Sequence, residues 1–135
     1  MGRAHQGISL GVLAGLSRDE ALLNYPEAAQ RLELWRKGCL KIDKLLIPSA
    51  EPVDSFKERV AKVLNEWVAC NSHPTIVAVC TRSTLIMMTN LITLADTFSY
   101  SQYRVYEFIE GSLTEIDIIG SSAHIFAINS NQLLA

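Results

Sequence analysis

The chain has 135 residues, 49% of them hydrophobic and 19% charged, so it has enough apolar residues for one hydrophobic core and too few residues for two. We therefore expect a single domain over residues 1–135 and exclude an intrinsically disordered chain. The 12 basic and 14 acidic residues give a formal charge of −2 and are scattered, which excludes an electrostatic footprint for nucleic acid or for an anionic membrane.

Helix signals dominate the first half of the chain. Ser17 and Glu20 form a capping-box pattern that predicts the start of a helix. Pro26 divides this helical region in two, and the second piece is expected to run to about Lys37, where Gly38 provides a stop. Pro48, Ser49 and Pro52, which interrupt regular structure, then predict a loop from Cys39 to Pro52.

A third helix is predicted from apolar residues that recur at spacings of three and four. Asp54 or Ser55 is expected to cap it, and it should end near Asn71. The apolar positions are Phe56, Val60, Val63, Leu64 and Trp67.

The second half of the chain reads as strands around one buried helix. Residues 75–80 are short, β-branched and apolar on both faces, which predicts a buried parallel strand. Residues 83–95 are apolar nearly all round, as in a helix that other elements cover. Further strands are predicted at 104–109, 113–119 and 123–128. The order of elements indicates an α/β fold.

Cysteine use and hydropathy suggest a location. An odd number of separated cysteines (Cys39, Cys70 and Cys80) argues against a closed disulfide framework and predicts a reducing, cytoplasmic setting. Residues 1–6 lack the apolar core of a signal peptide. The longest apolar stretch, about 75–95, is interrupted by Arg82 and Asn90, so no membrane span is expected.

Several short motifs follow one another in the order found in one known family. They are Gly11 to Ser17 with Tyr25-Pro26-Glu27, Glu51 with Phe56 and Arg59-Val60, Ile76 to Cys80, Gly111-Ser112-Leu113, and Ile128-Asn129-Ser130. Together they resemble the carboxyl-terminal part of a histidine phosphatase (phosphoglycerate mutase-like) domain. The resemblance implies a truncated phosphoglycerate mutase-like three-layer sandwich, with a mixed sheet and flanking helices. It also implies that the family's Arg-His-Gly half is missing.

The same resemblance implies that the catalytic groups are lost. The family needs a nucleophilic histidine, a second histidine and a carboxyl group as general acid. The second histidine aligns with Thr81 and the acid with Gly7, and Ala14 also departs from a glutamate of the motif. His5 stands in Arg-Ala-His-Gln-Gly rather than Arg-His-Gly, so we interpret it as a residue of the terminus and predict no catalytic residue.

Other reactive side chains favour structural roles. Cys70 and His73 resemble half of a metal site, but no second pair stands at ligand spacing, and we expect neither metal nor cofactor. Only one residue separates Cys80 from Arg82, which does not fit a cysteine phosphatase loop, so Cys80 is interpreted as a buried small hydrophobe. His124 has no carboxylate neighbour in sequence and is expected to be structural.

An anion site is the one functional feature that these residues retain. If the chain turns from strand to helix at Thr81, Arg82 and Ser83, free backbone N–H groups, two hydroxyls and one guanidinium converge there. The resemblance places the family's phosphate at the same turn. We therefore predict an anion-binding site at these three residues, with a solvated helix cap as the alternative.

The functional hypothesis is a pseudo-phosphatase that acts as an interaction or regulatory protein and binds a phosphorylated small molecule. One alternative is half of a split histidine phosphatase that another chain completes. Another is an enzyme of changed chemistry that uses Cys80, Thr81 or Arg82 in the old pocket. Because the family's Arg-His-Gly strand lies beside the strand like 76–80, we expect a homo-oligomer or a partner protein to complete the sheet.

Overall fold

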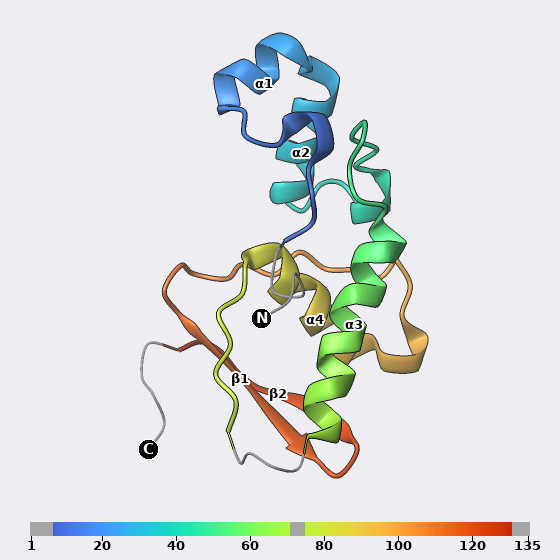
Figure 1. Cartoon of the computed structure of the whole chain (residues 1–135), viewed down its shortest axis with the longest axis vertical. Helices are drawn as coiled ribbons and strands as arrows, with labels where there is room; N and C mark the ends of the chain where they lie inside the picture. The colour runs from blue at the N-terminus through green and yellow to red at the C-terminus, as the bar shows by residue number, and fades with distance from the viewer. Residues whose placement is uncertain (1–6, 71–74, 131–135) are drawn as a thin grey trace.

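A computed structural model describes residues 7–70 and 75–130 (Figure 1). The helices are α1 (Arg18–Asn24), α2 (Pro26–Arg36), α3 (Val53–Ala69) and α4 (Arg82–Leu94), with short 3-10 turns at Gly11–Leu13, Ile42–Lys44 and Ala95–Thr97. The strands are β1 (Leu113–Ile119) and β2 (Ser122–Ser130). The fold is therefore a mixture of helices and one antiparallel pair of strands.

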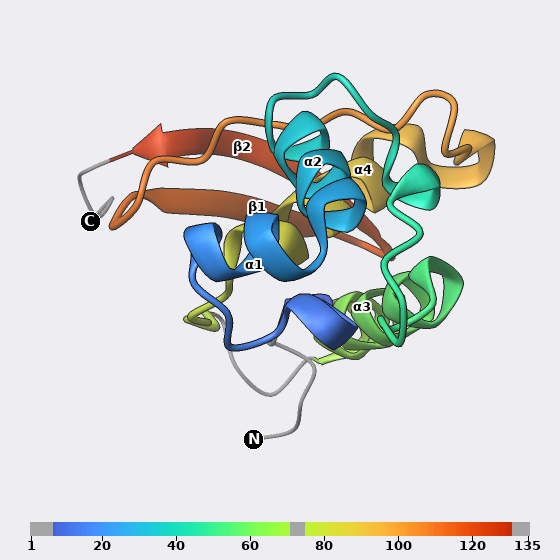
Figure 2. The same cartoon turned by 90° about the horizontal axis from the view of Figure 1, so that it is seen from above.

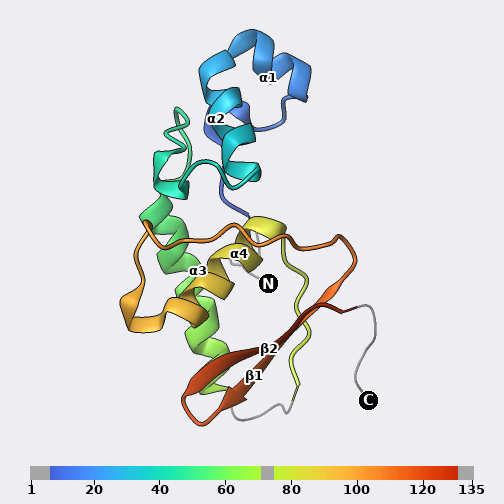
Figure 3. The same cartoon turned by 180° about the vertical axis from the view of Figure 1, so that it is seen from behind.

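The elements are arranged around α4. Helix α4 contacts α3 and β2, and the view from above shows the strands and α3 on different sides of it (Figure 2). Helices α1 and α2 pack on each other and form the end of the molecule at the top of Figure 1. The view from behind shows residues 98–112 running across the helices to reach β1 (Figure 3).

One hydrophobic core joins these parts. Phe56 and Val60 of α3 are 0% exposed, and Met87 of α4 is 0% exposed. The spacing of four between the first two puts them on one face of α3, where each buried side chain contributes about 1.5–3 kcal/mol. Leu32 and Trp35 extend the same core into α2.

The helix predictions are largely confirmed. Ser17 Oγ accepts from Glu20 N at 3.1 Å while Glu20 Oε2 accepts from Ser17 N at 3.0 Å, which completes the capping box of α1. Helix α3 forms as expected, but its cap was wrongly predicted. The N-cap is Pro52, and the side chain of Asp54 instead accepts the hydroxyl hydrogen bond of Tyr100.

The strands predicted at 113–119 and 123–128 are also confirmed. β1 and β2 pair antiparallel, with Ile119 opposite Ser122 and Gly120-Ser121 as the two-residue loop. Gly120 has φ of +64°, a conformation that such tight hairpin loops require.

Two predicted strands are wrong. Residues 75–80 form no strand, and Val77 and Val79 are 83% and 90% exposed rather than buried. Among the described residues, no backbone group of 75–79 has a hydrogen-bonding partner. Residues 104–109 also form no strand, because side-chain amides take up their backbone hydrogen bonds. The amide of Asn90 bonds with the backbone N–H and carbonyl of Arg104. The amide of Asn129 donates to Glu107 O and accepts from Ile109 N.

The sheet therefore differs from the expected mixed sheet. Over residues 7–70 and 75–130 it has two antiparallel strands and no parallel pair. Within the same ranges, no helix is long and apolar enough to cross a membrane.

Candidate anion-binding site

The start of α4 is the predicted anion site, and its local geometry is that of an open helix N-terminus. Thr81 is the N-cap, and its Oγ1 accepts from Thr84 N at 3.5 Å. Within the described part of the chain, the backbone N–H groups of Arg82 and Ser83 have no acceptor. Unpaired N–H groups and the aligned peptide dipoles of a 13-residue helix create a positive potential there.

The N-terminal segment closes one side of this turn. Ile8 N donates to Ser83 Oγ at 3.3 Å, and a Cβ added to Gly7 would lie 2.5 Å from Ser83 Oγ and 2.9 Å from Thr81 Oγ1. A side chain at position 7 would therefore require the hydroxyl groups of Ser83 and Thr81 to shift. The two positions that align with the family's acid and second histidine, Gly7 and Thr81, are thus neighbours in space although 74 positions separate them.

An internal ion pair anchors the same segment. Arg59 binds Glu51 in a bidentate pair, with Nε to Oε1 and Nη2 to Oε2 both at 3.0 Å. Arg59 Nη2 also donates to the carbonyl oxygen of Gly7 at 3.2 Å. Glu51 Oε2 accepts a further bond from Ser9 N at 3.4 Å. Because the Arg59 guanidinium is used in these bonds, it positions the segment 7–9 rather than an external anion.

A pocket of about 290 Å³ opens beside the start of α4. Its lining comprises Ile8, Leu10, Leu32, Trp35, Arg36, Thr81, Arg82 and Ser83. Arg82 makes no ion pair with any described residue, and Arg36 pairs only with Glu33, at 3.4 Å on the surface, where such pairs are weak. Both guanidinium groups are therefore available to a ligand.

Trp35 lines this pocket as a buried residue. Its side chain is 6% exposed, and its indole N–H has no acceptor among the described residues. Because the protein encloses the indole nitrogen, Trp35 presents ring surface to the pocket and not a hydrogen-bond donor.

The pocket has the chemistry of anion binding and lacks that of catalysis. Its polar groups can donate hydrogen bonds: two guanidinium groups, backbone N–H groups and two hydroxyls. Among the described residues that line it, none is Asp, Glu, His or Cys, so these residues offer no general base, no general acid and no strong nucleophile.

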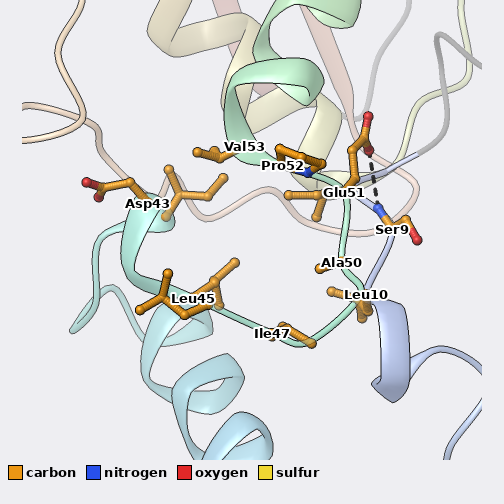
Figure 4. Close-up of a pocket in the computed structure, with 12 residues that line it drawn as sticks. Ser9, Leu10, Asp43, Leu45, Ile47, Ala50, Glu51, Pro52 and Val53 are labelled. Carbon is orange, nitrogen blue, oxygen red and sulfur yellow. Dashed lines mark hydrogen bonds between the residues drawn. The ribbon is translucent and has the colours of Figure 1, made fainter.

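A second hollow, of about 240 Å³, lies between residues 8–10 and the loop that leads into α3 (Figure 4). Most of the side chains around it are apolar, among them Leu10, Leu45 and Ile47. Glu51 is held by Arg59 and by the backbone of Ser9. Asp43 and Glu51 both line the hollow, but their carboxylates point in different directions and do not converge (Figure 4).

The remaining predicted residues lie outside the pocket. Burial raises the pKa of the Cys80 thiol, which keeps it neutral and argues against changed chemistry at this cysteine. His124 is exposed on β2 and lies opposite Asp117, a carboxylate neighbour that the sequence order does not reveal. His5 and His73 lie outside the described residues. In the part that is described, no group of three or more His, Cys, Asp or Glu residues could hold a metal ion.

Comparison with known proteins assigns no family. No protein-family model matches the chain, and neither a curated protein nor a solved structure matches it significantly. Function therefore has to be inferred from the pocket geometry and from the motif resemblance. The predicted residues Thr81, Arg82 and Ser83 line this pocket together with Arg36 and Trp35, which the sequence did not indicate because only the tertiary fold brings the end of α2 to the start of α4.

Proposed function

We propose that the chain is a non-catalytic homologue of histidine phosphatases that binds a phosphorylated ligand at the start of α4. The observation that carries the proposal is the convergence of Arg36 and Arg82 on a pocket bounded by the open N-terminus of α4. Guanidinium groups and helix N-termini are the preferred partners of phosphate in proteins.

The neighbouring positions of Gly7 and Thr81 support the non-catalytic part of the proposal. In the resemblance they correspond to the acid and to the second imidazole, which act on the same phosphoryl group. Here the first has no side chain, and the hydroxyl of the second caps α4. Neither can donate a proton to a leaving group at neutral pH, so binding without turnover follows.

Removing the Arg82 guanidinium is expected to abolish most of the phosphate affinity. The Arg82→Met variant should bind inorganic phosphate at least about tenfold more weakly, because a charge-assisted hydrogen bond contributes about 1.5–3 kcal/mol. Arg104→Met is the matched control, since Arg104 is an exposed arginine that does not line the pocket. Isothermal titration calorimetry on the wild type and both variants measures the difference.

The two parts of the proposal can fail separately. Equal phosphate affinity of the Arg82→Met variant and the wild type would reject the anion site. Hydrolysis of a phosphate monoester by the wild type, reduced in Arg82→Met and unchanged in Arg104→Met, would reject the non-catalytic assignment.

A second proposal concerns residues 75–79, whose backbone has no partner among the described residues. We propose that a second copy of the chain pairs with this segment. Residues 75–81 contain no charged side chain, so two copies can pair antiparallel about Ala78 without opposing like charges. Such pairing would also cover Val77 and Val79, which are 83% and 90% exposed.

The paired variant Val77→Lys with Val79→Lys tests the dimer. Light scattering during size exclusion should give a dimer for the wild type and a monomer for the variant, because the antiparallel pair would bring four ammonium groups together. Leu23→Lys is the control, since Leu23 is 82% exposed on α1 and should leave the dimer intact. A monomeric wild type would reject the homodimer. Copurification of a different chain that the lysine variant fails to bind would instead support the split-phosphatase alternative.

A further inference from the structure

The anion-binding pocket also has an apolar wall. Leu32 and Trp35 form buried parts of it at 7% and 6% exposure, and Ile8 and Leu10 are partly buried beside them. The arginines and the start of α4 make up the rest of the lining. The pocket is therefore divided into a cationic part and a hydrocarbon part.

The pocket is poor in hydrogen-bond acceptors for the hydroxyls of a ligand. Over residues 7–70 and 75–130, no Asp, Glu, Asn or Gln side chain lines it. The hydroxyl of Ser83 already accepts from Ile8 N, and that of Thr81 already accepts from Thr84 N. A sugar or glycerol group bound against Leu32 and Trp35 would lose its bonds to water and would not replace them, which lowers affinity.

We infer that the pocket binds a phosphate monoester whose organic group is apolar, such as an aryl or alkyl phosphate. The inference rests on the proposed phosphate site and specifies its ligand class. The phosphoryl oxygens accept from Arg82, Arg36 and the free N–H groups of α4, while the organic group packs on the wall formed by Leu10, Leu32 and Trp35. The volume of about 290 Å³ is at the small end of ligand pockets, as a single-ring ester requires.

Three probes separate this ligand class from a plain anion. Calorimetry should show phenyl phosphate binding roughly tenfold more tightly than inorganic phosphate, because the ring removes apolar surface from water. Glycerol phosphate, which has the same charge but a polar organic group, should gain no affinity over inorganic phosphate. The Arg82→Met variant should weaken the binding of all three.

A change in the apolar wall tests which side chains recognise the organic group. Leu10→Asn should reduce the affinity for phenyl phosphate several-fold and leave that for inorganic phosphate unchanged. The unchanged phosphate affinity also shows that the variant is folded. Leu34→Asn is the matched control, because Leu34 lies on α2 but does not line the pocket and is 38% exposed.

The outcomes distinguish this inference from the proposed function. Equal affinity for phenyl, glycerol and inorganic phosphate, all sensitive to Arg82→Met, would reject the apolar ligand class and keep the anion site. Tighter binding of glycerol phosphate than of phenyl phosphate would also reject it. Absence of binding by any probe at about 10 mM would reject both the site and the ligand class.

Discussion

Replacing Gly11 with alanine is expected to lower the free energy of unfolding by about 3 kcal/mol or more. Gly11 has φ of +54°, and a Cβ added there would overlap the carbonyl oxygen of Pro48 and the backbone nitrogen of Ala50. The variant therefore combines a left-handed conformation with a collision between two backbones. Neither backbone can move freely, because Val12 N donates to Pro48 O at 3.0 Å and Glu51 N donates to Ser9 O at 3.2 Å.

Gly15→Ala is a matched control for this prediction. Gly15 has φ of +77°, but no atom lies within 4 Å of the position of its added Cβ. Its replacement should cost only the conformational term, about 1–2 kcal/mol. Urea denaturation of both variants measures the difference. Equal losses would mean that the close approach of residues 11 and 48–50 contributes nothing to stability.

The Gly11→Ala substitution should also affect ligand binding, because Gly11 directly follows the segment that supplies Ile8 and Leu10 to the pocket. Displacement of this segment would also disturb the bond from Ile8 N to Ser83 Oγ at the start of α4. Gly11 therefore connects the stability of the chain with the shape of the pocket beside the start of α4.

Local sequence signals predicted the elements whose stabilising interactions are local. The capping box of Ser17 and Glu20 is formed by residues three positions apart, and the strands at 113–119 and 123–128 are separated by only the short Gly120-Ser121 loop that lets them pair. Helix α3 follows from apolar spacings along one segment. In each case the interactions that decide the structure are visible within one short stretch of sequence.

The wrong strand predictions have a physical cause in long-range pairing. A β-branched run such as 75–80 is suited to a sheet, but a strand exists only where another backbone pairs with it, and no described residue does so. At 104–109, the amide side chains of Asn90 and Asn129 supply hydrogen bonds that a neighbouring strand would otherwise make. Neither asparagine is distinguishable from a surface asparagine by sequence alone.

In the candidate site, too, the local features were predictable from sequence and the long-range ones were not. The turn at Thr81 to Ser83 was predictable because a β-branched run meets a helix start there, and the structure confirms that α4 begins at Arg82. Arg36 gave no signal of its own, since an arginine near a helix end usually only complements the helix dipole. Its contribution to the pocket depends on how the tertiary fold places the end of α2 relative to the start of α4, which periodicity does not specify.

Replacing Asn90 with alanine should lower the free energy of unfolding by about 3 kcal/mol. Asn90 is 1% exposed, and its Nδ2 donates to Ile86 O and Arg104 O at 2.8 Å each. Its Oδ1 accepts from Arg104 N at 2.8 Å. Alanine would leave the backbone of Arg104 without these partners and would open a small cavity. Asn65→Ala on the exposed face of α3 is the control and should change stability by about 0.5 kcal/mol or less.

An Asn90→Asp variant tests the same buried position in a second way, because its loss in free energy of unfolding should depend on pH. The carboxylate would keep the bond from Arg104 N but would face the carbonyl oxygens of Ile86 and Arg104 in a buried site. Burial and these oxygens would raise the folded-state pKa of Asp above its unfolded value. The loss of stability relative to Asn90→Ala should therefore be smallest near about pH 3 and should grow as the pH rises towards about pH 7. Urea denaturation at both pH values measures it, and a loss independent of pH would show that the side chain at position 90 reaches solvent.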